Sequence, residues 1–63
     1  MNRLSDGTYP NAGDAHLVFR TKDEILHRGR YIFDDFSIDQ LRWIDQVGTV
    51  FTSDVVTEWE YSL

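Results

Sequence analysis

The chain has 63 residues, no cysteine, and a formal net charge of −5 from six Lys/Arg and eleven Asp/Glu. These totals exclude disulfides and thiolate metal sites, and they disfavour direct binding to nucleic acid through its phosphates. No apolar run approaches the ~20 residues of a membrane span, and there is no signal-peptide pattern. We therefore expect a cytoplasmic protein with a single small domain over residues 1–63.

The charge is unevenly distributed along the chain. Residues 1–30 carry five basic and four acidic side chains, whereas residues 31–63 carry one basic and seven acidic side chains. This asymmetry predicts an acidic face, which would favour a protein partner with a basic surface. A chain of this length is marginally stable unless something reinforces it. Aromatic packing and self-association can both do so, and a homodimer is therefore an open alternative.

The first segment, residues 1–13, is rich in turn residues, with Gly7, Pro10 and Gly13 spread along it. Such a composition predicts an irregular N-terminal arm rather than a helix or strand. Leu4 and Tyr9 are the side chains that would anchor this arm to the body of the domain.

Two strands are predicted next, over residues 15–20 and 25–33, because both segments are rich in β-branched and aromatic residues. The short polar connection between them predicts a hairpin. Gly29 inside the second strand indicates a bulge or a close backbone approach. Alternation places Arg28 and Arg30 together on one face, either as ion-pair partners of Glu58 and Glu60 or as a binding patch.

The segment after this hairpin carries helix signals at both ends. Ser37 and Gln40 have the spacing of a capping box, and Phe36 and Leu41 have that of a hydrophobic staple. Gly48 lies where a left-handed residue would end the helix. Between these ends, apolar residues fall on one side of a 3.6-residue period. The pattern predicts an amphipathic helix over residues 38–47.

The last segment, residues 54–62, has a period of two, with apolar and aromatic residues on one face and Glu58 and Glu60 on the other. We expect a third strand here, while residues 49–51 are either a short extra strand or part of the connection. The predicted fold class is therefore α+β: a three-stranded antiparallel sheet over residues 15–20, 25–33 and 54–62, with the helix packed on one face.

Metal binding and catalysis are both disfavoured. Asp34, Asp35 and Asp39 lack the ligand spacing and the glycine of a calcium loop, and they are explained as charges at a helix N-terminus. His16 and His27 could face each other across the hairpin, but acidic ligands at zinc spacing are missing. Glu58 and Glu60 could form a catalytic pair, yet a chain this small rarely forms a substrate pocket. We expect no enzyme, no metal and no cofactor.

A protein-binding surface is the remaining functional hypothesis. The acidic residues either keep the protein soluble or present a negative surface that imitates nucleic-acid phosphates. Ile38 lies far from the centre of the apolar arc of the predicted helix, and Trp43 lies at the edge of this arc. Apolar residues outside the core-facing side are typical of a protein–protein interface. The predicted partner-binding residues are Asp34, Asp35, Ile38, Asp39, Trp43, Asp45, Glu58 and Glu60.

The chain resembles a family of small phage and prophage proteins of unknown function, whose course is LVxxxxG…GxYxxxF…VTHWxPL. The matching residues are Leu17-Val18, Gly29, Tyr31, Phe33 and the stretch VVTEWEYSL over residues 55–63. It departs from this pattern at Glu58, where the family has histidine, and it lacks the final proline-rich tail. The resemblance implies a phage origin and a place in the host cytoplasm, where very small acidic proteins often bind and inhibit host machinery.

Taken together, these features predict a small acidic, non-catalytic protein-binding module that inhibits or modulates a host protein. The alternative is a structural or accessory homodimer with no inhibitory role.

Overall fold

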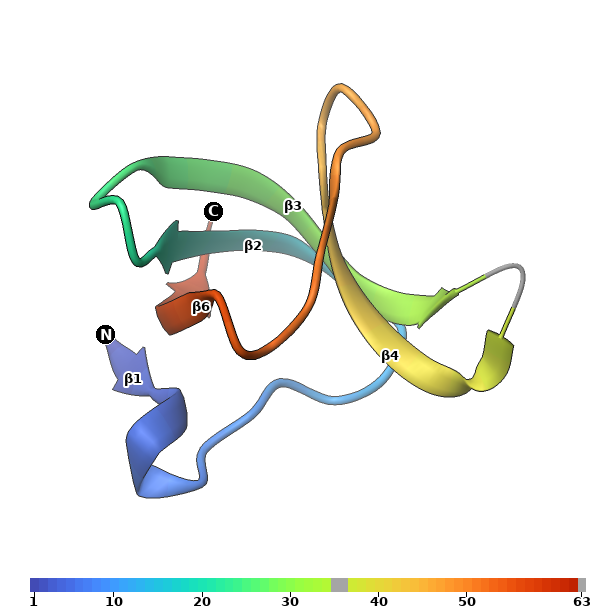
Figure 1. Cartoon of the computed structure of the whole chain (residues 1–63), viewed down its shortest axis with the longest axis horizontal. Coiled ribbons are helices and arrows are strands. Elements are labelled where there is room, and N and C mark those ends of the chain that lie inside the picture. The colour runs from blue at the N-terminus through green and yellow to red at the C-terminus, as the bar shows by residue number, and fades with distance from the viewer. Residues whose placement is uncertain (35–36, 63) are drawn as a thin grey trace.

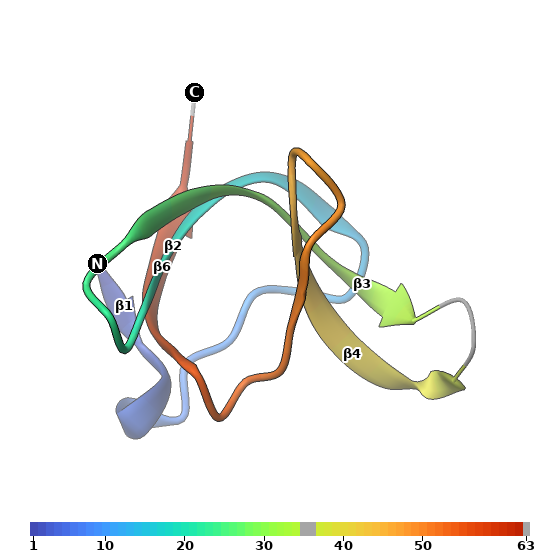
Figure 2. The ribbon, with the colours of Figure 1, turned by 45° about the horizontal axis from the view of Figure 1, so that its top comes forward.

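The computed structural model describes residues 1–34 and 37–62, and for residues 34 and 37–39 the backbone alone. Six strands form a single antiparallel sheet in the order β1-β6-β2-β3-β4-β5. The strands are β1 (Asn2–Arg3), β2 (Asp14–Thr21), β3 (Leu26–Asp34), β4 (Ser37–Asp45), β5 (Val50–Phe51) and β6 (Val56–Tyr61). The sheet is strongly curved (Figures 1 and 2).

The predicted α+β fold class is wrong. The only helix in the described residues is the three-residue 3-10 helix η1 (Leu4–Asp6), and the segment predicted as a helix over residues 38–47 is strand β4 instead. β4 pairs with β3 along most of its length, from Gly29 opposite Asp45 to Asp34 opposite Ser37. Among the residues that the structure describes, no helix is long and apolar enough to cross a membrane.

The apolar residues of β4 fit the 3.6-residue period of a helix and also the two-residue period of a strand. This is why the pattern predicted a helix. Leu41 and Trp43 alternate toward the core, and Trp43 has no exposed surface. A lone helix of about ten residues is marginal in water, whereas β3 offers this segment a full ladder of hydrogen bonds. Gly48 does adopt the predicted left-handed conformation, with φ 89°, but it closes a turn between strands.

The other three predicted strands are present, as β2, β3 and β6. One detail of β6 differs, because its register on β2 shifts between Glu58 opposite Arg20 and Val56 opposite Thr21. This bulge lets Val56 and Trp59 both face the core, with exposed fractions of 4% and 3%. The strict alternation predicted for this strand, which placed Val56 on the acidic face, is therefore wrong.

The core is aromatic and lies on the concave side of the sheet. It consists of Leu17, Phe19, Tyr31, Trp43, Val56 and Trp59, with Leu4, Leu41, Phe51 and Val55 packed against it. Phe19 contacts Trp43 with ring centroids 5.4 Å apart, and Tyr31 contacts Trp43 at 4.6 Å. Such tilted pairs add about 0.5–1.5 kcal/mol beyond the area that they bury.

Two hairpin turns share one backbone geometry. In the β2–β3 turn the Thr21 N–H donates to Ile25 O, and the Glu24 N–H donates to Thr21 O. In the β4–β5 turn the Asp45 N–H donates to Thr49 O, and the Gly48 N–H donates to Asp45 O. This is the three-residue loop that ends in a left-handed residue, where glycine is favoured. Glu24, with φ 70°, occupies the position that Gly48 fills in the other turn.

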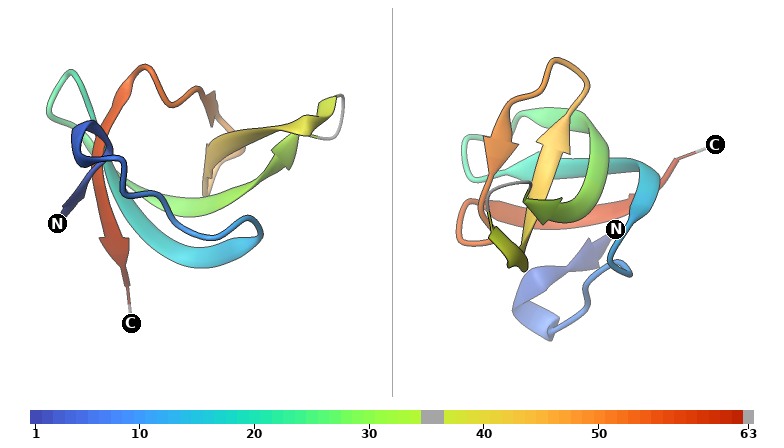
Figure 3. Two further views of the ribbon diagram at one scale, coloured as in Figure 1. Left: turned by 90° about the horizontal axis from the view of Figure 1, so that it is seen from below. Right: turned by 90° about the vertical axis from the view of Figure 1, so that its right-hand side faces the viewer.

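The N-terminal arm crosses the concave side of the sheet, from β1 to the start of β2 (Figure 3). Leu4 packs against the core, and the Tyr9 ring lies 6.4 Å from the Tyr31 ring. Both residues therefore anchor the arm as predicted. The predicted irregular course is wrong at the start of the arm, where β1 pairs Asn2 with Trp59 and Arg3 with Glu58 and is followed by η1.

Candidate functional site

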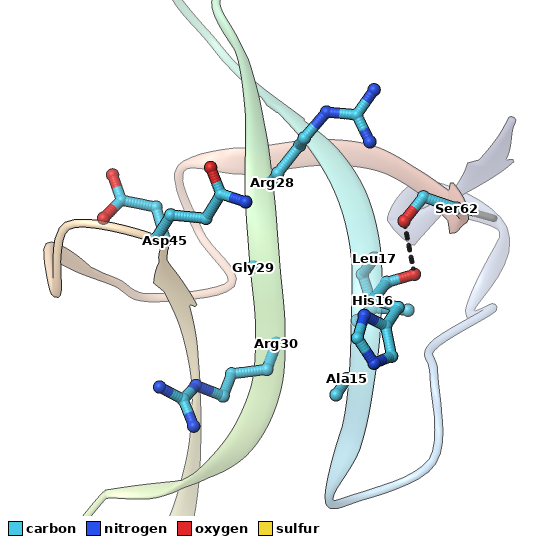
Figure 4. A pocket seen from close by; sticks show the side chains of 9 residues that line it. Ala15, His16, Leu17, Arg28, Gly29, Arg30, Asp45 and Ser62 are labelled. Carbon is cyan, nitrogen blue, oxygen red and sulfur yellow. Dashed lines mark hydrogen bonds between the residues drawn. The ribbon is translucent and has the colours of Figure 1, made fainter.

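A groove on the outer face of the sheet, turned away from the core, is the candidate site. Residues 15–17 of β2, 28–30 of β3, 45–46 at the end of β4, and Ser62 line it, and its volume is about 550 Å³ (Figure 4). Gly29 lies at the centre of this lining. We call it the Gly29 groove.

A β-bulge in β2 forms one wall of the Gly29 groove. The register moves from Asp14 opposite Tyr31 to Leu17 opposite Gly29, so that Ala15 and His16 together oppose one residue of β3. His16 has φ 58°, a left-handed conformation that costs most residues about 1–2 kcal/mol. Ser62 fastens the bulge, because its N–H and its hydroxyl both donate to the His16 carbonyl, at 2.7 and 2.8 Å.

Gly29 is required where β3 and β4 cross. A Cβ added here would lie 1.9 Å from the carbonyl oxygen of Ile44 and 2.8 Å from the Cα of Asp45, both of them backbone atoms. The prediction of a close backbone approach at Gly29 is thus confirmed, whereas the alternative of a bulge at Gly29 is wrong, because the bulge lies in β2. This crossing bends the sheet and separates the arginines on either side of Gly29.

Hydrogen-bond donors dominate the Gly29 groove. Arg28 and Arg30 are exposed and extend from β3 in different directions, and the His16 ring lies on β2 at the other side of the groove (Figure 4). Neither guanidinium forms an ion pair with a carboxylate among the described residues. Two arginines on one strand face lie roughly 7 Å apart, and each can bind a carboxylate or phosphate through two parallel hydrogen bonds.

The carboxylate in the lining, Asp45, is already engaged. Its Oδ1 accepts from the Val47 N–H at 3.1 Å and from the Thr49 N–H at 2.8 Å. Its Oδ2 lies 3.6 Å from Nδ1 of His27, and only 13% of the side chain is exposed. Asp45 therefore holds the β4–β5 turn, and its charge is directed away from Arg28 and Arg30. The groove is suited to an anion.

A second cluster, which sequence reasoning missed, links three strands on the core side. His27 lies between Asp45 and Thr21, whose Oγ1 is 3.3 Å from its Nε2. The ring of His27 also stacks on Phe19 at 5.3 Å and contacts Phe51 at 4.7 Å. Residues from β2, β3 and β4 meet here because β3 lies between β2 and β4 in the sheet, and their sequence spacing gave no signal.

The arrangement of Asp45, His27 and Thr21 links neighbouring strands and does not provide a nucleophile. Thr21 is 5% exposed, and its hydroxyl donates to the Asp23 carboxylate with the Ile25 carbonyl also in reach. That hydrogen bond holds the pKa of the Asp23 carboxyl below its usual value. A serine-type mechanism needs a hydroxyl that is free to reach a substrate and a histidine free to take its proton, and here the hydroxyl is committed to a turn.

The predicted site residues do not gather on one face. Glu58 pairs with Arg20, with Nε and Oε1 2.9 Å apart, while Glu60 is exposed on the same strand. Trp43 is fully buried and donates its indole N–H to Ser53 Oγ at 3.0 Å, so its ring offers no surface to a partner. Asp45 holds a turn, as described above.

Three of the remaining predicted residues lie at the paired ends of β3 and β4. Asp34 lies in β3, and Ile38 and Asp39 lie in β4. The side chains of these three residues, and Asp35 altogether, lie outside the described part of the structure. In the sheet order this end belongs to β3 and β4, whereas Glu58 and Glu60 are on β6, two strands from β3.

The basic residues also pair differently from the sequence-based proposal. Arg20, not Arg28 or Arg30, is the ion-pair partner of Glu58, because β2 lies between β3 and β6. Val18 separates Arg28 from Glu60 in register. The histidines do not face each other either, since His16 is in the bulge on the outer face and His27 stacks on Phe19.

The chain matches no protein-family model, and the comparisons with curated proteins and with solved structures find no match either. The resemblance to small phage proteins therefore stays a prediction. Within the described residues, no three histidine or carboxylate side chains converge in a way that could hold a metal ion.

Proposed function

We propose that this chain is a small, non-catalytic protein-binding module, and that the Gly29 groove receives an acidic segment of its partner. The observation that carries this proposal is the exposed pair Arg28 and Arg30 on one strand face, next to a strained histidine. Strained backbone residues and bulges often occur at functional sites.

The spacing of the two arginines defines the ligand. In an extended peptide, side chains at alternate positions point the same way and lie roughly 7 Å apart. A peptide with carboxylates at several alternate positions can reach both guanidiniums although they diverge from β3 (Figure 4).

The acidic-docking hypothesis remains as the competing binding mode. It rests mainly on Asp34, Asp35 and Asp39, which would face a basic partner near the end of the β3–β4 hairpin. A phage-encoded inhibitor in the host cytoplasm is compatible with either mode. An accessory homodimer is the third alternative, and sedimentation equilibrium tests it directly, since a species of one chain mass at high concentration excludes it.

A peptide titration separates the two binding modes. The probe is a synthetic ten-residue peptide with glutamate at alternate positions, followed by NMR of the full chain, and a glutamine version is its neutral control. Arg28→Glu with Arg30→Glu should abolish binding. Arg3→Glu with Lys22→Glu, which changes the net charge equally away from the groove, should weaken binding only through long-range attraction that salt screens.

The result that rejects the groove is equal loss of binding in the two reversal variants, or no binding to the unmodified chain. A lysine-containing peptide serves the competing mode. The acidic surface is the docking site instead if this peptide binds the unmodified chain and if a variant with Asp34→Lys, Asp35→Lys and Asp39→Lys no longer binds it.

A further inference from the structure

The N-terminal arm holds a short stretch of chain, Thr8 to Pro10, in an aromatic environment on the concave side of the sheet. The indole N–H of Trp59 donates to the carbonyl oxygen of Thr8 at 2.9 Å. Pro10 is buried, and the Tyr9 ring lies 6.4 Å from that of Tyr31. Trp59 and Tyr31 both belong to the core cluster.

The stretch is tethered on both sides but lightly held between its tethers. On one side, the Gly7 N–H donates to Leu4 O and ends η1. On the other side, the Gly13 N–H donates to Tyr31 O at 2.8 Å. Between these points it belongs to no helix or strand. Its hydrogen bond to the rest of the chain comes from a side chain, the indole of Trp59.

This arrangement has the chemistry by which proteins recognise proline-containing segments. Proline lacks an N–H, so an extended segment around it presents carbonyl acceptors and an apolar ring. Grooves lined with aromatic rings bind such segments because little conformational entropy is lost. A tryptophan N–H directed at a backbone carbonyl provides the polar part of that recognition, and the Tyr31 ring near the next residue of the arm, Tyr9, provides the apolar part.

We propose that Trp59 and Tyr31 form a recognition groove for an extended, proline-containing segment of a partner, and that Thr8–Pro10 occupies this groove as an internal substitute ligand. The groove lies on the concave side and is independent of the Gly29 groove on the outer face. The arm is therefore an autoinhibitory element, and a partner must displace it.

Competition between the arm and the partner sets the expected affinity. A segment tethered at both ends is present at an effective concentration of roughly millimolar. The apparent affinity for a second segment falls in proportion to the fraction of molecules whose groove is open. Weakening the arm should therefore strengthen binding from solution, although the groove itself is unchanged.

The test uses the full chain carrying Tyr9→Ala and Pro10→Gly. The probe is a synthetic peptide with the sequence of residues 5–13, SDGTYPNAG, and a second peptide with alanine in place of its proline is the control. The chain has two tryptophans, so NMR offers two indole N–H signals. Trp59 reports the groove, and Trp43, bonded to Ser53, reports the intact core.

We expect the arm variant to bind the proline peptide at least tenfold more tightly than the unmodified chain does. The Trp59 indole signal should shift on binding, whereas the Trp43 indole, which can sense the groove only through Tyr31, should shift less and keep the position of a folded core. Trp59→Phe in the same background, which keeps a ring but removes the N–H, should reverse most of this gain. Binding that is no tighter in the arm variant, or that is the same for the alanine peptide, overturns the proposal.

Hydrogen exchange of the unmodified chain covers the case in which the arm variant does not fold. An arm that opens locally lets the Trp59 indole exchange well before the Trp43 indole. Equal exchange of the two indoles, at the rate of global unfolding, would show that the arm is an inseparable part of the core and would equally reject the proposal.

Discussion

Gly29→Ala is the substitution that most directly tests how the sheet is built. The added Cβ would meet the Ile44 carbonyl oxygen at 1.9 Å, whereas real Cβ contacts are essentially never shorter than 3.0 Å. The two backbones would have to separate by the difference of about 1.1 Å. Because both atoms belong to hydrogen-bonded strands, no side chain can turn aside to make room.

The cost of this substitution is large for a domain of this size. Inserting a methyl group into a tightly packed region typically costs 1–3 kcal/mol, and more where backbone must move. We expect at least about 3 kcal/mol here. At roughly 0.05–0.15 kcal/mol per residue, a 63-residue domain has a total stability of about 3–9 kcal/mol. Tm should therefore fall by more than about 10 °C.

Urea unfolding followed by tryptophan fluorescence measures this loss, because Trp43 and Trp59 are both buried. Gly48→Ala is the matched control. Its φ of 89° strains an alanine, but no atom lies within 4 Å of the added Cβ, so it should lose about 1–2 kcal/mol. If Gly29→Ala proves no more costly than Gly48→Ala, the strand crossing is not as tight as described, and the reasoning fails.

Three further predictions concern single interactions. Glu24→Gly should raise the free energy of unfolding by about 1 kcal/mol, because glycine adopts the left-handed turn position without strain, and a higher urea midpoint would show it. The pKa of the Asp23 carboxyl lies below its usual value because the Thr21 hydroxyl donates to it. This contact therefore stabilises the fold at pH values above the pKa of Asp23 in the unfolded chain, and its contribution is lost as the pH falls through the lower pKa of the folded chain. Thr21→Val, but not Thr21→Ser, should return its NMR titration to the ordinary range. A double-mutant cycle on Arg20 and Glu58, a partly exposed pair, should give a coupling of about 0.2–1 kcal/mol that shrinks at high salt, and a coupling insensitive to salt would contradict an ionic origin.

The strands of the sheet could be predicted where one period dominates, as in β2, β3 and most of β6. The segment of β4 could not, because Leu41 and Trp43 fit the period of a strand while Leu41 and Ile44 fit that of a helix. Gly48, in addition, has the left-handed backbone that can end either a helix or a hairpin turn. What decided between them was the neighbouring strand, which is tertiary information. A conflict of this kind is resolved by the element that offers the segment more backbone hydrogen bonds and burial.

The candidate site was predictable only in part. Alternation correctly placed Arg28 and Arg30 on one face, and Gly29 was recognised as a close approach. The bulge at His16 has no sequence signal, because it arises from the way β2 follows the bend in β3. The predicted acidic face is not formed around Glu58 and Asp45, because each of them contacts a residue of the neighbouring strand. Glu58 pairs with Arg20, and Asp45 lies next to His27.

The two left-handed residues that are not glycine, His16 and Glu24, separate a structural role from a functional one. Gly48 occupies the position in the β4–β5 turn that Glu24 occupies in the β2–β3 turn, so glycine can adopt this backbone conformation. The Glu24 carbonyl accepts from Arg20 Nη1 at 3.3 Å, a backbone contact that glycine would preserve. His16 likewise uses only its carbonyl to hold Ser62. Glycine at either position should therefore stabilise the fold by about 1 kcal/mol. Only at His16 should it also weaken binding of the acidic peptide, because that imidazole lines the same groove as the two arginines. If both variants keep full peptide affinity, the strain at His16 has no function in the groove, and the bulge is a consequence of the bend alone.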